Sequence, residues 1–532
     1  MSMNAAEHVL MGGLEVSGAD KTAIESAGEC LSYGQLAVRV SQYSAALRAN
    51  GLRHGDRVAL LMLDSPDLVA LHLAVMSAGG IAVALTARAT PAELQHMLTI
   101  TRPGVVVVDD EFAALSLESI HAVTPSSKLF LRHQDLAGWK QRGETKLAFS
   151  AMKATDPAYW VMTSGTTGQP KAVEHRHDNV LSCTHYLSDA LAAGAEDRFL
   201  ATSRLHFAYA LGTTLFGALR IGATTILHER WPTPATIAAM IGTHRPTIFL
   251  SVPTLYHKLL EAGLADGKAF ATIRRCVSAG ERLAPKIADE WQRATGTPIL
   301  DAMSCSELIH KIFANTPSRR RAGASGRPMP GVKVRLIDPD GLEVTEAGRT
   351  GRLEVLAPFL CAGYRVADTP PDGPPHRPPN RFRDGWFATG DEYLRDEDGY
   401  FHHCGRTDDM LKIAGLWVSP SEIEDALADI PSIAEAAAVS AESAAGLSEI
   451  VLYIVVTPGA AGESTISEAR DRLSRRLPAF KLPRRYAIVA ELPRTATGKI
   501  QRHKLRSGAD GARVSNDPVV TALSPQRKYA RR

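Results

Sequence analysis

Short apolar segments that alternate with helical segments are the feature that most constrains how this chain can fold. Residues 57–61, 81–85 and 105–108 form runs that are apolar along most of their length, and the Ala- and Leu-rich segment 66–78 separates the first two runs. Strands without a polar face, alternating with helices, are typical of a parallel sheet that helices cover on both sides. The sequence therefore predicts an α/β fold.

The same alternation returns later in the chain and predicts a second βα sheet. Strands are expected at 221–227 and 247–252, and helices at 234–244 and 254–262. The two sheets together would occupy most of the first four hundred residues.

The order of these segments predicts the domain organisation. We expect a large N-terminal domain, residues 1–407, made of the two βα sheets and a small β-rich subdomain near 330–365. A small, mobile α+β C-terminal domain, residues 408–506, would follow, and the polar, basic tail 507–532 is expected to be disordered. The proline-rich segment 368–379 is expected to form an exposed, extended loop.

Length and composition limit the functional classes. A chain of 532 residues exceeds one compact core, and a net charge of +3 gives no argument for a nucleic-acid partner. The six cysteines contain no C-x-x-C pair, which is typical of reduced thiols in a cytosolic protein. There is no signal-peptide pattern and no apolar run long enough to cross a bilayer, so we expect a soluble, cytoplasmic protein without a membrane partner.

The segment 163–171, TSGTTGQPK, combines glycines, hydroxyl side chains and a lysine directly after the apolar run 159–162. Glycines let the backbone approach an anion, N–H groups and hydroxyls can surround phosphate oxygens, and a lysine adds positive charge. The spacing is not that of a Walker A loop, and Ala172 stands where that loop has its magnesium-binding hydroxyl. Because a Gly/Ser/Thr-rich segment alone is most often an ordinary loop, the interpretation depends on the rest of the chain.

Three further motifs follow in order. They are 304–310 (SCSELIH), the pair 386–391 (WFATGD) with 405–412 (GRTDDMLK), and 493–500 (PRTATGKI). Each has an ordinary structural explanation, because a glutamate at a helix start is usually a capping or solvated residue and a lysine in a Thr/Gly loop is usually only exposed. Their value lies in their combination with the glycine-rich loop.

In this order the four motifs resemble those of the adenylate-forming superfamily, which includes acyl- and aryl-CoA synthetases, adenylation domains of peptide synthetases, and luciferases. The resemblance covers roughly residues 30–506. It implies an enzyme that uses ATP and Mg²⁺ to convert a carboxylic acid into an acyl-adenylate. A ligand-binding relative without turnover is the alternative from another class, and the presence of the expected charged residues argues against it.

The resemblance also implies roles for single residues. Lys171, Ser306, Glu307 and Lys499 would be catalytic: Ser306 would meet the α-phosphate, Glu307 would hold Mg²⁺, and Lys499 would reach the acid carboxylate and the α-phosphate. The implied nucleotide site consists of Thr163, Ser164, Gly165, Thr166, Thr167, Gly168, Lys171, Gly280, Glu281, Asp301, Ser306, Asp391, Arg406 and Lys499, with Asp391 and Arg406 on the ribose.

Two further roles concern the second step of such an enzyme. Asp408 matches the hinge at which the small domain rotates. Coenzyme A is the implied acceptor, and Lys412, Gly415 and Trp417 would line its channel. A homodimer is left open.

The identity of the acid rests on the segment 205–212. Peptide-synthetase adenylation domains carry an aspartate where this chain has Ala208, and a buried ammonium without that partner is costly, so α-amino acids are disfavoured. The segment instead resembles benzoate-CoA ligases, as do 306–310 and 405–412. The resemblance implies a small flat pocket for an aromatic ring, lined by Phe207, Ala208, Tyr209, Ala279, Gly280, Ser304, Ile309 and His310.

Other interpretations of these residues stay open. Phe207 and Tyr209 are equally compatible with ordinary core aromatics, and His310 with a histidine satisfied by its neighbours. The sequence departs from the benzoate pattern at Arg204, His206, Ser304 and Lys311, which leaves the ring substituent undetermined. We predict an aryl-CoA ligase for benzoate, 2-aminobenzoate or a hydroxybenzoate. The alternatives are a ligase for alicyclic or medium-chain acids, and an adenylase that loads a carrier protein.

Overall fold

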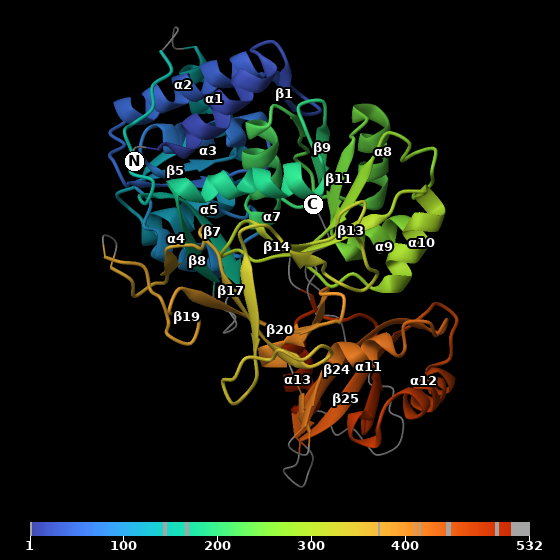
Figure 1. Cartoon of the computed structure of the whole chain (residues 1–532). Helices are drawn as coiled ribbons and strands as arrows, with labels where there is room; N and C mark the ends of the chain where they lie inside the picture. The colour runs from blue at the N-terminus through green and yellow to red at the C-terminus, as the bar shows by residue number, and fades with distance from the viewer. Residues whose placement is uncertain are drawn as a thin grey trace. The chain divides into compact units, whose positions relative to one another are not determined.

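The computed structural model (Figure 1) describes residues 3–141, 146–164, 170–370, 373–409, 411–413, 416–442, 448–494 and 500–511. The chain forms two compact units. The larger contains Met1–Val334 and Glu354–Thr389, and the smaller contains Arg335–Leu353 and Gly390–Arg532. Mixed helices and largely parallel sheets confirm the predicted α/β class, while the domain boundary at residue 407 stays a prediction.

The first sheet of the larger unit has seven strands in the order β18-β8-β7-β4-β3-β5-β6. The pairs from β7 to β6 are parallel, and β8 and β18 extend the sheet antiparallel. The predicted apolar runs form three of these strands, and each is buried along nearly its whole length. The strands are β3 (Arg57–Leu61), β4 (Ile81–Ala84), β5 (Val105–Val108), β6 (Lys128–Leu131), β7 (Pro157–Ser164), β8 (Pro170–Arg176) and β18 (Gly363–Arg365).

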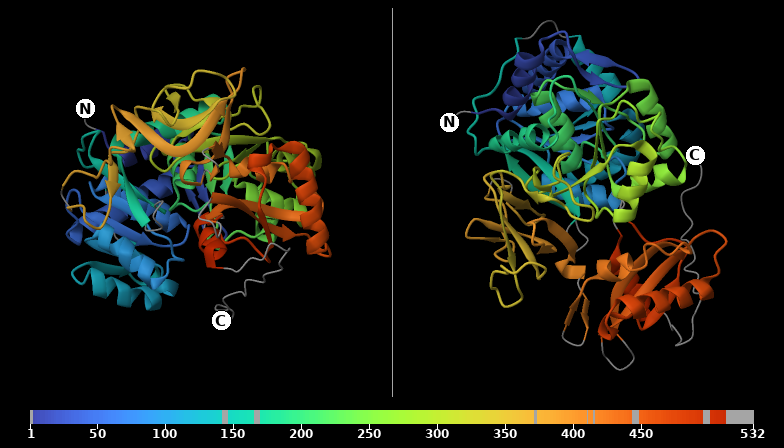
Figure 2. Two further views of the ribbon diagram at one scale, coloured as in Figure 1. Left: turned by 90° about the horizontal axis from the view of Figure 1, so that it is seen from below. Right: turned by 45° about the vertical axis from the view of Figure 1, so that its right-hand side comes forward.

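The second sheet has nine strands in the order β15-β14-β13-β12-β11-β9-β10-β1-β2. Figure 2 shows the larger unit from two further sides. The sheet is parallel from β13 to β1 and antiparallel at both ends. The strands are β1 (Thr22–Glu25), β2 (Cys30–Ser32), β9 (Arg198–Ala201), β10 (Thr224–Ile226), β11 (Ile248–Ser251), β12 (Arg275–Ser278), β13 (Ile299–Ser304), β14 (Lys311–Ala314) and β15 (Arg327–Pro328).

Helices bury the apolar faces of both sheets. One of them, α3, is predominantly apolar; every one of its residues is buried, and the helix packs against α1, α2 and β4. The helices of the larger unit are α1 (Ala5–Ser17), α2 (Tyr33–Ala49), α3 (Pro66–Ser77), α4 (Pro91–Thr101), α5 (Asp110–Val123), α6 (Arg132–Lys140), η1 (His177–Thr184), η2 (Tyr186–Ala190), α7 (Ala208–Ala210), η3 (Leu211–Ala218), α8 (Pro234–His244), α9 (Pro253–Glu261) and α10 (Pro285–Thr295).

Local sequence signals determine where several helices begin. Ser32 and Gln35 form a capping box at the start of α2. Ser65 accepts a hydrogen bond from Leu68 N ahead of α3, and Pro66 occupies the first helical position. Each such bond satisfies a backbone N–H that has no partner within the helix.

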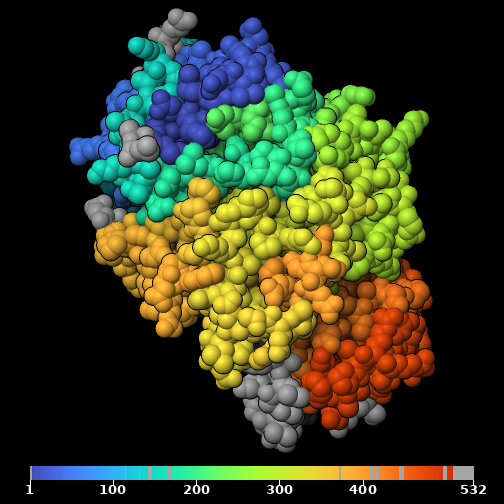
Figure 3. Space-filling model, in the orientation of Figure 1, coloured from blue at the N-terminus to red at the C-terminus, as the bar shows by residue number. Residues whose placement is uncertain are grey.

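The N-terminal helix α1 is fixed to the segment that begins at η1, and Figure 3 shows the two side by side on one face of the larger unit. The backbone N–H of Ala5 donates to His177 Nδ1 at 2.9 Å. Burial lowers the pKa of His177 to about 4, so the ring is neutral at pH 7 and Nδ1 can accept this bond.

The proline-rich segment 368–379 folds back onto β18. In its described part, His376 and Tyr364 exchange two backbone hydrogen bonds of 2.8 and 2.9 Å, and Arg365 Nη1 donates to Pro370 O at 3.2 Å. Several of its residues are exposed, as the sequence predicted. The segment thereby holds β18, and with it Tyr364, in place.

The smaller unit contains a three-stranded sheet, β24-β25-β26, covered by α11 and α12 around one apolar core. The remaining strands form a β22-β23 pair and a five-stranded sheet, β16-β17-β20-β19 with β21 beside β20. By residue number, β19 and parts of β16, β17 and β20 belong to the larger unit. The elements are β16 (Lys333–Ile337), β17 (Thr350–Leu356), β19 (Phe382–Arg383), β20 (Trp386–Arg395), β21 (Phe401–Arg406), η4 (Thr407–Asp409), β22 (Leu411–Ile413), β23 (Leu416–Val418), α11 (Pro420–Asp425), β24 (Ile433–Glu442), β25 (Ser448–Val456), α12 (Gly462–Arg476), η5 (Ala479–Lys481), β26 (Arg485–Ile488) and α13 (Arg502–Gly511).

Two expectations about the chain ends and membranes can be compared with this fold. Helix α13 continues past the predicted domain end at 506 to Gly511, and residues 512–532 of the predicted tail lie outside the described residues. In the described part of the chain, none of the helices combines the length and apolar character needed to cross a bilayer.

Candidate active site

Strands β7 and β8 carry the two ends of the predicted phosphate loop. Thr163 pairs with Lys171 across the two strands, and Ser164 pairs with Pro170. The loop ends are therefore held next to each other by a regular antiparallel ladder. Gly165, Thr166, Thr167 and Gly168, expected to contact phosphate, lie outside the described residues, and so does the side chain of Ser164.

Tyr364 connects Lys171 with Glu307. Lys171 Nζ lies 3.4 Å from the centroid of the Tyr364 ring, and the Tyr364 hydroxyl donates to Glu307 Oε1 at 2.6 Å. Burial and the negative charge of Glu307 both raise the pKa of Tyr364 above its usual value, so the hydroxyl stays protonated and remains a donor. The structure thus brings together two residues predicted from separate motifs.

Tyr364 was not among the site residues predicted from the sequence. The residue lies in β18 opposite Val173 of β8, almost two hundred residues away in the sequence. A short Gly-Tyr-Arg strand gives no signal of its own, because only the pairing of β18 with β8 brings the phenol to Lys171 and Glu307.

The turn that carries Ser306 and Glu307 is fixed through its backbone. The His175 ring donates from Nε2 to Ser306 O at 2.8 Å, and Cys361 N donates to Glu307 O at 2.8 Å. Burial lowers the pKa of His175 to about 4, although its hydrogen bonds oppose the shift, so a neutral ring holds this turn at pH 7. The turn joins β13 to β14, so the ordinary alternative for Glu307, a capping residue at a helix start, does not apply.

Ile309 and Gly212 explain why this turn cannot be helical. Ile309 has φ of 54°, a left-handed conformation that is strained for a β-branched residue. A Cβ atom on Gly212 would lie 2.8 Å from Ile309 O and 2.9 Å from Ile309 Cγ1. Glycine in η3 therefore allows the close approach that keeps Ile309 in this conformation.

Two residues predicted to line the acid pocket, Tyr209 and Ser304, lie close to the same lysine, Lys311. Lys311 Nζ lies 3.9 Å from the centroid of the Tyr209 ring and 3.3 Å from Ser304 Oγ. The Tyr209 hydroxyl donates to Val277 O at 3.4 Å, which orients the ring. Two of the predicted pocket residues, Tyr209 and Ser304, thus share one partner, Lys311, which the sequence analysis had noted only as a departure.

The other predicted pocket residues lie close to these in the sequence. Phe207 directly precedes α7, with its ring centroid 4.1 Å from that of His206, and Ala208 begins the helix. Ala279 is buried. His310 is also buried, and its Nδ1 has no hydrogen-bond partner in the described part of the chain. Burial, aided by the charges of His185 and Lys311, lowers the pKa of His310 to about 3, so the imidazole is neutral.

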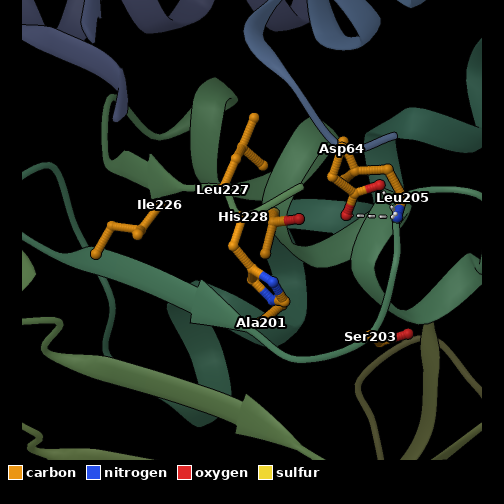
Figure 4. A pocket seen from close by; sticks show the side chains of 8 residues that line it. Asp64, Ala201, Ser203, Leu205, Ile226, Leu227 and His228 are labelled. Carbon is orange, nitrogen blue, oxygen red and sulfur yellow. Dashed lines mark hydrogen bonds between the residues drawn. The ribbon is translucent and has the colours of Figure 1, made fainter. Parts of the chain in front are cut away.

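The loop ahead of α7 is anchored by Asp64, as Figure 4 shows. Leu205 N donates to both oxygens of Asp64 at 3.2 Å, and Arg204 Nη1 lies 3.8 Å from Asp64 Oδ2. Arg204 also donates to the backbone oxygens of His228 and Arg230. Arg204, at which the sequence departs from the benzoate pattern, is therefore a buried side chain that holds this loop in place.

Three predicted nucleotide-site residues lie just after β12 or within β13: Gly280, Glu281 and Asp301. Gly280 has φ of 90°, which favours glycine. Glu281 Oε2 accepts from Thr254 N at 3.2 Å and from Thr254 Oγ1 at 2.7 Å, so this carboxylate caps the start of α9. Burial raises the pKa of Asp301 to about 7, and its Oδ1 has no hydrogen-bond partner among the described residues.

In the smaller unit, the structure brings together the two residues predicted to bind ribose. Asp391 in β20 pairs with Arg406 in β21, and Arg406 Nη1 donates to Asp391 Oδ1 at 2.9 Å. His403 Nε2 lies 3.6 Å from the same oxygen. Burial opposes ionisation, but Arg406 and His403 outweigh it and hold the pKa of Asp391 below its usual range. Asp391 is therefore an ionised, oriented acceptor.

Several predicted residues cannot be placed. Lys499 and Gly415 lie outside the described residues, and so do the side chains of Asp408, Lys412 and Trp417.

The arrangement corresponds to a known family. The chain belongs to the AMP-binding enzymes: the family description "AMP-binding enzyme" matches residues 15–365, and "AMP-binding enzyme C-terminal domain" matches residues 422–499. This confirms the predicted membership of the adenylate-forming superfamily.

Individual relatives extend over almost the whole chain. The chain is 37% identical over 512 residues to a 3-hydroxybenzoate–CoA ligase of Aromatoleum sp. (strain CIB), covering 95% of this chain and 97% of that protein. It is 34% identical to a benzoate–CoA ligase of Thauera aromatica, covering 95% and 96%. The crystal structure of an anthranilate CoA ligase in complex with anthranoyl-AMP matches with a TM-score of 0.87 and 32% identity, over 96% of this chain and 98% of that one.

Proposed function

We propose that this protein is an ATP-dependent aryl-CoA ligase. It activates a small aromatic carboxylic acid as the acyl-adenylate, with release of pyrophosphate, and then transfers the acyl group to coenzyme A. The observation that carries the proposal is the contact of Lys171 and Glu307 with one side chain, Tyr364, because it sets a cation and a carboxylate beside the ends of the phosphate loop. The names of the relatives support the aromatic acid and coenzyme A as substrates.

In the first step the acid carboxylate attacks the α-phosphorus of ATP in line, and pyrophosphate leaves. Lys171 and Lys499 stabilise the negative charge that develops on the phosphate oxygens, and the Ser306 hydroxyl binds the α-phosphate. Asp391 and Arg406 hold the ribose, which orients the nucleotide for the attack.

Glu307 suits a Mg²⁺ site, since this ion prefers one or two carboxylates together with phosphate oxygens of the substrate. Among the described residues, no group of three or more metal-binding side chains could hold an ion by itself, which agrees with ligands supplied by the nucleotide. Bound Mg²⁺ would neutralise phosphate charge as pyrophosphate leaves.

In the second step the C-terminal domain, residues 408–506, rotates about Asp408 and withdraws Lys499. The coenzyme A thiolate then attacks the acyl-adenylate carbonyl and AMP leaves. Lys412, Gly415 and Trp417 are proposed to line the pantetheine channel. The six cysteines are free thiols, which supports a cytoplasmic location, and a homodimer is a further proposal.

The first test is AMP formation from ATP and Mg²⁺ over a panel of acids, with and without coenzyme A. We expect turnover that depends on coenzyme A with one small aryl acid among benzoate, 2-aminobenzoate and the hydroxybenzoates. Turnover of octanoate or cyclohexanecarboxylate alone would contradict the aromatic pocket. Adenylation that is indifferent to coenzyme A would identify a carrier protein as the acceptor.

The role of Lys499 is tested separately with Lys499→Ala. This variant should lose adenylation but keep thioester formation from supplied acyl-adenylate, because Lys499 is proposed to act only in the first step. Equal loss of both half-reactions would refute the assignment.

A further inference from the structure

Lys311 is a buried lysine in the predicted acid pocket. It begins β14, where the antiparallel ladder pairs it with Ser304 at the end of β13. The residue is only 3% exposed. Its Nζ lies 3.9 Å from the centroid of the Tyr209 ring and 5.6 Å from that of Tyr186. The backbone pairing therefore fixes the Lys311 amino group beside Tyr209 and Ser304, two of the residues predicted to line the pocket.

This ammonium has few partners. A lysine can donate three hydrogen bonds, yet within the described residues Ser304 Oγ, at 3.3 Å, is the single acceptor of Nζ. No described carboxylate lies within 4.0 Å of it. Burial lowers the pKa of Lys311 to about 7, although the Asp301 charge opposes the shift.

The fold itself gains little from such a residue. An incompletely paired buried cation is costly, and an apolar side chain of similar length would pack between the tyrosine rings without that cost. Two N–H donors of Lys311 thus stay available for a ligand that enters the pocket.

We infer that Lys311 determines the substrate specificity of this pocket: together with Ser304 it donates hydrogen bonds to the oxygen of a ring hydroxyl, so that the acid is a monohydroxybenzoate. This inference rests on the proposed function. Lys311 binds the substituent and takes no part in bond making at the carboxylate.

The chemistry of the pocket favours a hydroxyl over the other ring substituents. An unsubstituted ring would leave the ammonium unpaired after water is displaced. An aromatic amine would direct its N–H groups at the N–H groups of Lys311, and two donors do not form a hydrogen bond. A neutral hydroxyl oxygen accepts from Lys311 without adding charge.

The test compares kcat/KM for benzoate with kcat/KM for 2-, 3- and 4-hydroxybenzoate, measured as coenzyme-A-dependent AMP formation. The wild-type protein should prefer one hydroxybenzoate over benzoate by about tenfold or more. Lys311→Met should lower kcat/KM for that hydroxybenzoate by about 10- to 100-fold, mainly through KM, and reduce benzoate turnover far less, so the preference is lost. Lys311→Arg, which keeps the charge, should retain part of the preference.

Two further variants keep the test decisive. Lys268→Met removes an exposed lysine of the same unit and should leave the substrate ratio unchanged. Ser304→Ala removes the other proposed donor without changing the charge and should lower hydroxybenzoate turnover by about three- to tenfold. This variant decides the question even if Lys311→Met does not fold, which thermal denaturation reveals.

Two results would overturn the inference while leaving the proposed function intact. One is a wild-type protein that uses benzoate as well as every hydroxybenzoate. The other is a substrate ratio that Lys311→Met does not change. Failure of every aryl acid to support AMP formation would instead refute the proposed function.

Discussion

The bond between Tyr364 and Glu307 allows a quantitative test of the active site. Tyr364→Phe removes only the hydroxyl that donates to Glu307 Oε1 at 2.6 Å, and leaves a ring that can still face Lys171. Arg381 Nη2 lies 4.0 Å from Glu307 Oε1, beyond hydrogen-bonding distance. The variant therefore leaves a buried carboxylate without its short, charge-assisted hydrogen bond.

The expected effect follows from the strength of this bond. A hydrogen bond to a charged group contributes about 1.5–3 kcal/mol, and each 1.4 kcal/mol is about tenfold in rate. If the bond orients Glu307 for catalysis, kcat/KM for ATP should fall by about 10- to 150-fold. The Mg²⁺ concentration for half-maximal rate should rise, because Glu307 is the proposed carboxylate ligand. Both quantities are measured by acid-dependent AMP formation.

Tyr33→Phe is the matched control. The Tyr33 hydroxyl is buried and donates to Leu219 O at 3.1 Å and to Ala223 O at 2.7 Å, away from the proposed catalytic residues. This variant should lower the free energy of unfolding by about 1–2 kcal/mol and leave kcat/KM unchanged. The argument would be refuted if Tyr364→Phe kept wild-type kcat/KM and Mg²⁺ response, or if both variants lost activity equally.

Two further predictions concern stability. Gly212→Ala should destabilise the protein by about 1–3 kcal/mol in thermal denaturation, because the new Cβ would lie 2.8 Å from Ile309 O. Gly242→Ala in helix α8, where the new Cβ would have no atom within 4 Å, should stabilise the protein by about 0.5–1 kcal/mol. Unchanged stability of Gly212→Ala would contradict the close packing of Gly212 against Ile309. The pKa of Asp391 is depressed below the ordinary 3.8, so its ionised form stabilises the fold above that pH, and the contribution shrinks as pH falls below about 4. Wild type should therefore exceed Asp391→Asn in stability at pH 7, and this advantage should begin to shrink below about pH 4 and disappear only as pH falls through the depressed pKa of folded Asp391. A difference that does not change with pH would contradict it.

Much of the fold follows from periodicity that is local in the sequence. The apolar run 105–108 became β5 with the predicted bounds, and the helix predicted at 234–244 is α8. Such elements can be predicted because burial on both faces requires continuous apolar residues, and a capping residue such as Thr233 favours a helix start.

Predictions were weaker where the backbone departs from regular structure. For the segment after Ser304 the sequence offered a helix start only as the ordinary alternative for Glu307, and nothing in it indicated the left-handed conformation of Ile309. This conformation depends on close contact with Gly212, almost a hundred residues earlier in the sequence. Local propensity cannot indicate such a contact, because it arises only when η3 packs against the turn.

The sequence by itself determined the superfamily, the α/β class and the motifs that supply cations, hydroxyls and carboxylates. It did so because each motif is a continuous stretch of sequence and the motifs follow one another in the order that the superfamily has. Only the tertiary structure showed that Tyr364 joins Lys171 to Glu307, and that Lys311 lies between Tyr209 and Ser304. Both arrangements depend on the pairing of strands, β18 with β8 and β14 with β13. The pairing of β18 with β8 and the contact of Lys311 with Tyr209 join residues about a hundred or more positions apart in the sequence. These side chains therefore carry no common signal in the sequence.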